Sequence, residues 1–482
     1  MIRNMEVKLL GIDNYENMNK IAKEQSQVVS SAGRLSRFKG DVLEIYEKSN
    51  KDLKDNNKFI KNVTSMGHDS ITDHDYLVFA LKNVSVLVEQ VIIAQRFCSF
   101  TIKSRREVDF SKAGFYIPDF HDKDGNLLEN NKELQEYYID HEKSLFNEYK
   151  DLLNKKILQE DARFILPYSF NSNIIMGLDA HALKDLIVNL TKGPLSKITE
   201  LKTLGEKLYD IAKERCEYII PAIDKTKVDT ENHILEVLNK YTPQSEINQT
   251  PIEKVLLLES PENIDDKIFI SAIMRQFNCS VDNAINIYIN YFNTNERKEE
   301  LIHAIKENQL QDIYKSDLKS INFKFQIPVS LATLTHITRH RTVDLNIPDF
   351  VPIRDLTQYK IPSSIKDMDY NLNKIFNNNY EIYNFFKKCG VRDEDLVYFY
   401  LSGNMLNIKF NMDGKTLQHF LSLRCCNKAQ WEIRNIAEEM RHLVSEKAPY
   451  FSKLLGPTCE VDQVCHEGKE SCGKIKKILK KQ

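Results

Sequence analysis

The sequence predicts an α+β fold in which one kind of module, a mixed sheet with long helices, is present twice. The chain of 482 residues is long enough for two or three domains. Short segments of the first half recur in the second half at a nearly constant spacing. Strand-like alternation and helical periodicity follow each other without a regular βαβ rhythm, which favours α+β over a doubly wound fold.

The recurrence rests on two pairs of segments. Glu16-Asn17 resembles Glu262-Asn263, 246 residues later, and the apolar segment 85–96 resembles 330–341, 245 residues later. Two spacings that agree within one residue indicate a duplicated module, with chance matching of short apolar runs as the alternative. We therefore expect modules at residues 1–223 and 252–452, a linker at 224–251 and a cysteine-containing tail at 453–482.

The elements are expected in the same order in both modules. A short apolar strand comes first, an alternating strand follows, a serine then caps a helix, and long helices close the module. The expected strands are Val7–Ile12, Tyr76–Leu81, Val255–Leu258 and Ile321–Ile327. The capping serines are Ser85 and Ser330, the closing helices span 182–190 onward and 416–446, and the linker holds a short helix at 232–241.

Composition excludes several classes of protein. Lys and Arg number 67 against 69 Asp and Glu, a formal charge of −2, which removes the electrostatic case for a nucleic-acid binder. No run of about 18 apolar residues predicts a membrane span. Nine cysteines are too few for a disulfide framework, and the N-terminus lacks the apolar core of a signal peptide. We expect a cytoplasmic protein.

Residues 96–106 hold the candidate binding cluster of the first module. Guanidinium groups match phosphate oxygens in a bidentate geometry and serine hydroxyls add donors, so the cluster suits a phosphorylated ligand. Its central members are Ser104, Arg105 and Arg106. A solvated basic surface is the alternative. Upstream, His68 and Ser70 lie in a polar segment before a strand, where loop capping is the alternative role.

The second module has its own cluster at the end of an apolar helix, Arg339-His340-Arg341. Two arginines beside a histidine are costly to bury without an anion, and His336 shares a helix face with Arg339. A cation that stabilises the helix C-terminus is the alternative. Further along, Lys415 and His419 align at helical spacing.

Together these motifs resemble the flavin-dependent thymidylate synthases. The first module carries Gly67-His68-x-Ser70, Arg96-x-x-Ser99, Ser104-x-Arg106 and Arg163-x-x-Leu166-Pro167. The second carries Arg339-His340-Arg341, His419-Phe420-Leu421-x-Leu423-Arg424 and Gln430-Trp431-Glu432-Ile433-Arg434. Ordinary members of that family are single modules of about half this length that form homotetramers, so the resemblance implies a homodimer here.

Each module keeps a different part of the family's signature. In the first module, Ala94-Gln95-Arg96 replaces the Arg-His-Arg triplet, and the position of Arg424 falls near Leu190 or Thr191. In the second module, Asp344 replaces the motif serine. Random decay of one duplicate would not leave complementary losses. The pattern therefore suggests a composite site shared by the two modules.

The resemblance implies a role for each matching residue. Arg106, Arg339 and Arg424 are expected to be catalytic. The nucleotide is expected to be bound by Ser104, Arg105, Arg106, Arg163, His336, Arg339 and Arg424. FAD is expected to be bound by His68, Ser70, Arg339, His340, Arg341, Asp413, Lys415 and His419. Asp413 stands where the family commonly has Asn, and Lys415 where Arg is usual.

The implied reaction is the reductive methylation of dUMP to dTMP. FAD would carry hydride, and methylene-tetrahydrofolate and NADPH would be co-substrates. One alternative is a flavin-dependent transferase acting on another pyrimidine nucleotide. The other is a non-catalytic nucleotide-binding or assembly protein.

The tail carries cysteines that the resemblance does not cover. Cys459, Cys465, His466 and Cys472 provide the donor set of a structural zinc site, although the spacing lacks a tight Cys-x2-Cys knuckle. Free or redox-sensitive cysteines on a flexible tail are the alternative. Cys425 and Cys426, next to Arg424, are interpreted as helix-core cysteines without a nucleophilic role.

Overall fold

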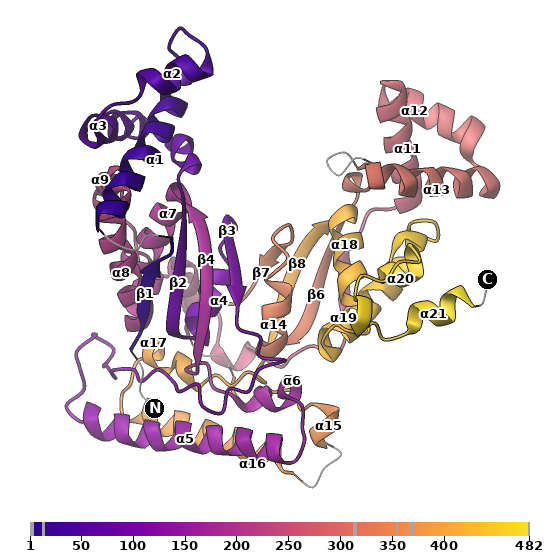
Figure 1. Ribbon diagram of the computed structural model, residues 1–482. Helices are drawn as coiled ribbons and strands as arrows, with labels where there is room; N and C mark the ends of the chain where they lie inside the picture. Colours follow the sequence, from indigo (N-terminus) through magenta and orange to yellow (C-terminus); the bar gives the residue numbers. More distant parts are fainter. Residues whose placement is uncertain (1–3, 12–14, 312–315, 353–354, 367–369, 481–482) are drawn as a thin grey trace. The chain divides into compact units, whose positions relative to one another are not determined.

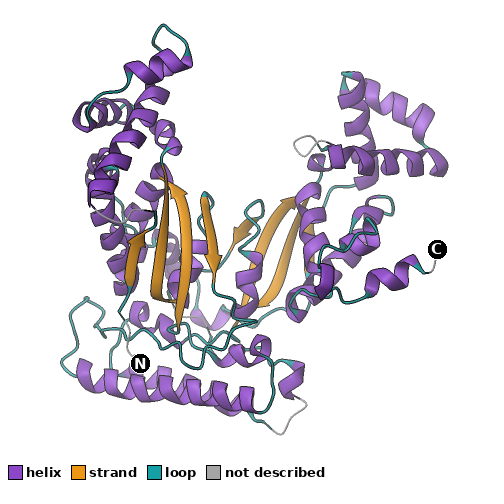
Figure 2. Cartoon of the chain, viewed as in Figure 1, coloured by secondary structure: helices purple, strands orange, loops and turns teal. Residues whose placement is uncertain are grey.

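The computed structural model describes residues 4–11, 15–311, 316–352, 355–366 and 370–480. The chain divides into two compact units. Unit 1 comprises Met1–Gln249 and Phe350–Asn404, and unit 2 comprises Thr250–Asp349 and Met405–Gln482. Each unit contains a four-stranded antiparallel sheet surrounded by helices (Figure 2). The predicted α+β class is confirmed, but all the described strand pairs are antiparallel, so the prediction of a mixed sheet is wrong.

The sheet of unit 1 has the strand order β1-β2-β4-β3. Its strands are β1 (Glu6–Leu9), β2 (Tyr76–Ser85), β4 (Asn171–Asp179) and β3 (Cys98–Ile102). In β2 the side chains of Leu77, Phe79 and Leu81 are buried while Lys82 is exposed, because alternate residues of a strand point to opposite faces. The strand predicted from this alternation is confirmed, and it extends to the capping serine.

The sheet of unit 2 has the order β5-β6-β8-β7, the same arrangement with the second set of strands. Its strands are β5 (Leu256–Glu259), β6 (Asn322–Ser330), β8 (Met405–Asp413) and β7 (Asp344–Asn346). Two sheets with one topology, each built from strands in the same sequence order, confirm that the chain contains a duplicated module.

Helices pack around each sheet (Figure 1). The main helices of unit 1 are α1 (Tyr15–Leu35), α2 (Val42–Lys48), α3 (Leu53–Thr64), α4 (Val86–Ile93), α5 (Asn131–Asn154), α7 (Ala180–Thr191), α8 (Thr199–Arg215), α9 (Ile220–Lys225), α10 (His233–Tyr241) and α16 (Leu372–Lys388). Those of unit 2 are α11 (Ile264–Phe277), α12 (Val281–Ile287), α13 (Asn295–Gln311), α14 (Leu331–Ile337), α18 (Gly414–Arg424), α19 (Trp431–Ser445), α20 (Thr458–Val461) and α21 (Lys474–Leu479). The short helix expected in the linker is α10.

A serine begins the helix after the central strand in both units, as predicted. The hydroxyl of Ser85 accepts from the Val88 amide at 3.3 Å, and that of Ser330 accepts from the Thr333 amide at 3.2 Å. Each serine amide also donates to a buried glutamate, at 2.8 Å in both units. These carboxyls, Glu200 and Glu432, tie the capped helix to a later helix of the same unit.

The closing segment of the second module, expected as helical over residues 416–446, consists of two helices. Helix α18 ends at Arg424 and α19 begins at Trp431. The side-chain oxygen of Gln430 accepts from the amides of Glu432 and Ile433, both at 3.0 Å, and so caps the second helix. Because this cap satisfies the first free amides of α19, the chain turns between the helices.

Residues 350–404 come from the second half of the sequence but pack within unit 1. Helix α16 lies alongside α5 (Figure 1), and the Nε2 of His141 donates a 2.9 Å hydrogen bond to the side-chain oxygen of Asn379. Also within unit 1, Pro167 forms an antiparallel bridge with Leu401. The compact units therefore differ from the sequence modules, whose proposed boundaries rest on the sequence repeat alone.

Two hydrogen bonds around that bridge are related by symmetry. The Tyr168 amide donates to the Tyr400 carbonyl at 2.8 Å, and the Ser402 amide donates to the Leu166 carbonyl at 2.9 Å. Residues 168 and 402 are separated by 234 positions, and so are 166 and 400. The two copies of this segment thus meet each other as equivalent segments do across a two-fold axis. Among the described residues, no helix is long and apolar enough to span a membrane.

Candidate functional site

The predicted nucleotide residues of the first module converge on Glu160. The Arg106 Nε donates to the Glu160 carboxylate, and the Arg163 Nε donates to the Glu160 backbone carbonyl at 3.1 Å. The Ser104 hydroxyl accepts from the Arg106 amide at 3.3 Å, which fixes the turn that carries this arginine. Sequence reasoning named the two arginines and the serine and missed Glu160, although it stands one helical turn before Arg163.

Burial distinguishes the two arginines. Arg163 is 2% exposed, whereas the side chains of Arg106 and Glu160 retain 29% and 19% of their accessible surface. A buried guanidinium is costly unless it is paired, so Arg163 provides a fixed positive charge beneath an accessible ion pair. This arrangement can receive an anionic group at Arg106 while Arg163 stays in place.

Arg105, also expected at the nucleotide, points to a different partner. Its Nη2 donates to the Glu89 carboxylate at 2.7 Å, and the side chains of this ion pair are 4% and 1% exposed. The second Glu89 oxygen accepts from the Ser172 hydroxyl at 2.7 Å. Sequence reasoning missed Glu89, which lies in the apolar run of α4 and gave no signal beyond a charge within that run.

Several buried polar atoms near this ion pair have no hydrogen-bond partner among the described residues. They are the Nη1 of Arg105, the Nε2 of Gln90, the hydroxyl of Tyr168, and the amide oxygen and nitrogen of Asn171. An unsatisfied buried polar group costs about 1–3 kcal/mol. This cluster therefore suits a bound polar group, either ordered water or part of a ligand.

His68 and Ser70 lie at the start of the short helix η1 (Asp69–His74), and both are exposed. The Nε2 of His68 stands 3.3 Å from an Nη of Arg37 on the helix α1–α2 connection. Neighbouring Asp69 accepts from Lys184 of α7 at 2.7 Å. The segment thus presents an accessible imidazole next to a guanidinium, and no described contact links it to the cluster around Glu160.

In unit 2, Arg424 joins the Arg-His-Arg segment. Its Nε donates to the Nε2 of His340 at 2.8 Å, and its Nη2 donates to the His336 carbonyl at 2.8 Å. Arg339 and Arg341 are exposed on either side of the buried His340. The structure therefore brings the end of α14 and the end of α18 together.

The environment of His340 favours its neutral form. Burial, the Arg424 guanidinium and His419 lower the pKa of His340 to about 3. Its ring packs 4.8 Å from the Phe420 ring, centre to centre. A neutral imidazole that accepts at Nε2 must carry its proton on Nδ1, so Arg424 fixes the tautomer. Burial and Arg424 also lower the pKa of His419.

The remaining predicted flavin residues lie on or before α18. The Asp413 carboxylate accepts from the Thr416 amide at 2.7 Å and is the N-cap of this helix. This contact gives Asp413 a structural role in addition to the expected one. Lys415 is half-buried in the first turn, and His419 is exposed one turn later. Arg424 is the last residue of the same helix.

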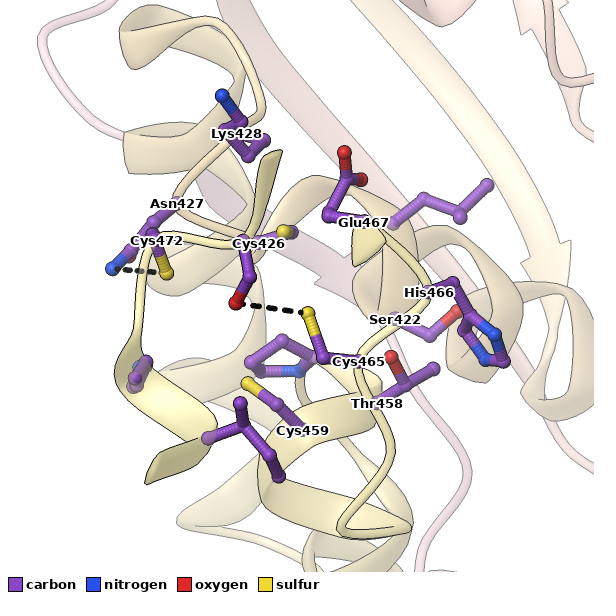
Figure 3. Close-up of a pocket in the computed structure, with 15 residues that line it drawn as sticks. Ser422, Cys426, Asn427, Lys428, Thr458, Cys459, Cys465, His466, Glu467 and Cys472 are labelled. Carbon is purple, nitrogen blue, oxygen red and sulfur yellow. Dashed lines mark hydrogen bonds between the residues drawn. The ribbon is translucent and has the colours of Figure 1, made fainter. Parts of the chain in front are cut away.

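The cysteine tail forms a cavity together with the end of α18 (Figure 3). Cys459, Cys465 and Cys472 line it, but the ring of His466 points away from their sulfur atoms in Figure 3. Among the described residues, no group of three or more Cys, His, Asp or Glu side chains stands close enough to hold a single metal ion. The donor set predicted for zinc is therefore not assembled around one point.

Cys426 also lines this cavity, whereas Cys425 is buried outside its lining. The expectation of two helix-core cysteines thus needs correction for Cys426, which lies in the turn after α18 and faces the tail. Sequence spacing gave no sign of this contact because 33 residues separate Cys426 from Cys459.

Comparison with known proteins identifies the family. The family model described as thymidylate synthase complementing protein matches residues 18–218 and again residues 264–450. The chain belongs to this family. The two matches cover most of the sequence, one in each half, so the family domain is present twice.

Parts of the chain are similar to known proteins from other organisms. A flavin-dependent thymidylate synthase from Clostridium tetani is 32% identical over 189 residues, which cover 35% of this chain and 75% of the relative. One from Saccharolobus solfataricus is 31% identical over 143 residues, 28% of this chain and 55% of the relative. A solved UMP/dUMP methylase, PolB from Streptomyces cacaoi bound with 5-Br dUMP, is 19% identical and covers 46% of this chain and 95% of its own, with a TM-score of 0.37.

Proposed function

We propose that this protein is a FAD-dependent thymidylate synthase that converts dUMP to dTMP, with methylene-tetrahydrofolate as one-carbon donor and NADPH as reductant. Family membership in both halves supports the reaction class. The choice of a nucleotide substrate rests on one observation: Arg106 and Arg163 both donate hydrogen bonds to Glu160, so the two guanidinium groups lie close together. Two guanidinium groups beside the Ser104 hydroxyl suit a nucleotide monophosphate.

The arginines act by placement and charge. Arg163 is buried and fixed, so it keeps a positive potential beneath the site without reorganising when the nucleotide binds. Arg106 is partly exposed and pairs with Glu160, so the phosphate would share or replace this carboxylate. In the other half, Arg424 is held by His340 and the His336 carbonyl, which limits its motion before substrate binds.

The residues expected at the flavin have the donor chemistry that a dinucleotide cofactor requires. Arg339, Arg341 and His68 are exposed, and Lys415 is half-buried, so their positive or hydrogen-bonding ends are accessible to a pyrophosphate. Neutral His340 keeps its proton on Nδ1 and would orient Arg424 beside the cofactor. When bound, FAD would supply the hydride that reduces the transferred carbon.

We further propose that both halves contribute to one activity. The first half keeps the phosphate residues and the second keeps Arg339, His340 and Arg424. If Arg106→Ala and Arg339→Ala each abolish dUMP binding in calorimetry while both proteins remain folded, shared use is supported. Unimpaired binding in either variant contradicts the sharing, while leaving the reaction itself open to a direct assay.

The decisive experiment is complementation of a thymidine auxotroph by the full chain. Growth without thymidine, abolished by Arg424→Ala, supports the proposal. Tritium release from dUMP labelled at C5, with NADPH and methylene-tetrahydrofolate, distinguishes it from a transferase acting on another pyrimidine nucleotide. Purified protein that holds no FAD and releases no tritium would indicate a non-catalytic binding protein instead.

The expected homodimer and cytoplasmic location remain predictions, whereas zinc in the tail has no support, because no three donors among the described residues stand close enough to hold one ion. A homodimer would supply four family modules, the number found in the family's tetramers. Sedimentation velocity checks it directly, since a monomer has the mass of 56.2 kDa and a dimer twice that mass.

A further inference from the structure

Four cysteines from three separate segments surround one cavity in unit 2 (Figure 3). Cys426 lies in the turn between α18 and α19, Cys459 lies in α20, and Cys465 and Cys472 lie in the loops before α21. The sulfur atoms of all four surround a common space in Figure 3. Each of the four cysteines is a free thiol.

The size of the cavity indicates what could occupy it. Its volume is about 90 Å³. One water needs about 10–15 Å³ on the same measure, so the space admits a group of several atoms. The described thiols do not converge closely enough to hold a single ion. Four thiols around one cavity would suit a polynuclear iron–sulfur cluster, whose thiolate ligands stand further apart than those of a single zinc ion.

The chemistry of the lining agrees with a thiolate-bound cluster. Leu423, Pro457 and Ile475 provide apolar walls, and Lys428 and Lys474, each paired with a glutamate, also line the cavity. A cluster with four thiolates carries net negative charge, which lysines stabilise.

Polar contacts to two of the sulfur atoms are already present. The Asn427 amide donates to the Cys472 sulfur at 3.6 Å. The Cys465 thiol donates to the Ser471 hydroxyl at 3.4 Å, and this proton would be lost on metal binding. Hydrogen bonds to sulfur ligands are a common feature of iron–sulfur sites.

We propose that Cys426, Cys459, Cys465 and Cys472 bind a 4Fe–4S cluster that fastens the C-terminal tail to the turn between α18 and α19. Its role is structural: the cluster holds the tail against the helix that carries His419 and Arg424. The site is separate from the residues of the proposed thymidylate synthase reaction, so its occupancy can be tested without measuring activity.

The test starts from the full chain, produced with added iron and purified without oxygen. We expect about four irons and four acid-labile sulfides per chain. Because bound flavin absorbs in the same visible region, iron and sulfide analysis and the EPR spectrum after dithionite reduction are the primary measurements. They are made on the wild-type chain, so the result does not depend on how a variant folds.

Variants then assign the ligands. Cys426→Ala and Cys472→Ala should each lose most of the iron, whereas Cys279→Ala should keep it, because Cys279 is a free cysteine of the same unit outside the cavity. His466→Ala should also keep the iron. Limited proteolysis should cut the tail faster in Cys426→Ala than in Cys279→Ala.

Three results would overturn the proposal. One zinc per chain without sulfide, lost in His466→Ala, would support a mononuclear zinc site instead. The wild-type chain could also retain neither iron nor zinc after anaerobic reconstitution with iron and sulfide, and show four reactive thiols. The cavity would then have no role in metal binding. Iron retained in both Cys426→Ala and Cys472→Ala would place the cluster elsewhere.

Discussion

Helices α7 and α18 occupy equivalent places in the two modules and begin alike. The carboxylates of Asp179 and Asp413 each accept from an amide three residues later at 2.7 Å. These two caps are 234 residues apart, as are Pro167 and Leu401. Local structure is thus preserved where a helix must leave the central strand of its sheet.

The same helices end differently. In α7 the position equivalent to Arg424 is Leu190, which is fully buried where α8 passes closest. In α18, Arg424 leaves the helix end and reaches His340. At this position α7 has an apolar side chain that packs in the core, whereas α18 has a charged side chain. The two copies therefore keep the same N-terminal cap, whereas the C-terminal ends of these helices have different side chains with different roles.

Exchanging the two side chains should have opposite consequences, and Leu190→Arg should have the largest effect. A Cβ added to Gly205 of α8 would lie 2.7 Å from the Leu190 Cβ, so the helices leave no room for a longer side chain. An unpaired buried guanidinium costs about 3–5 kcal/mol. We expect unit 1 to unfold at much lower urea, measured by far-UV circular dichroism.

Leu190→Met is the matched control, because a volume-conserving swap costs below about 1.5 kcal/mol. Trp431 is the single tryptophan and lies in unit 2, so its fluorescence follows that unit separately. Wild-type stability in Leu190→Arg would mean that this helix end is not a packed position.

Arg424→Leu, the reverse exchange, should spare the fold and remove activity. The guanidinium is partly exposed and makes hydrogen bonds that a leucine cannot replace. We expect tritium release from C5-labelled dUMP to fall by about a hundredfold, or about 2.7 kcal/mol of transition-state stabilisation. Arg424→Lys should restore little, because an ammonium does not reproduce the fork geometry. A loss below threefold would exclude a role for Arg424 in the reaction.

The sequence predicted the parts of the fold that depend on local pattern. Alternation located β2 and β6, and the serines before α4 and α14 cap as expected. The resemblance brought Arg424 and His340 into one site, and the structure joins them at 2.8 Å. Such signals survive in a single sequence because periodicity and caps act over a few residues.

Other features were beyond the reach of sequence because they depend on contacts between distant segments. The packing of residues 350–404 in unit 1 follows from pairing Pro167 with Leu401. In the sequence, Glu89 is a lone charge within an apolar run, and only the structure shows that Arg105 donates to it at 2.7 Å. Cys426 joined the tail cysteines only in three dimensions. No spacing rule connects such residues in advance.

A second equivalent pair differs by one hydroxyl and should give a smaller effect. Thr333 of α14 donates to the buried Glu432 carboxylate at 2.8 Å, whereas the equivalent residue of α4 is Val88. Thr333→Val keeps the shape and leaves the carboxylate with one donor fewer, so we expect a loss of about 1.5–3 kcal/mol. Urea unfolding followed by Trp431 fluorescence measures it. Thr333→Ser, which keeps the hydroxyl and removes only a methyl group, controls for packing in the same unit, and equal stability of Thr333→Val and wild type would refute the role of this hydroxyl.

The last expected effect concerns pH, and it arises only in the unit that contains Arg424. The pKa of His340 is lowered to about 3 in the folded chain, against about 6.5 in the unfolded chain. Below pH 6.5 the unfolded chain therefore binds a proton that the folded chain rejects, so the stabilisation present above pH 6.5 is lost as the pH falls. The groups facing this imidazole are Arg424 and His419, which act in the same direction. Relative to His340→Gln, the unfolding free energy of the wild type should decline by about 1.4 kcal/mol for each pH unit between about 6 and 4. A difference between the two proteins that does not change with pH would mean that His340 takes up a proton as readily in the folded chain as in the unfolded chain, against a role as acceptor from Arg424.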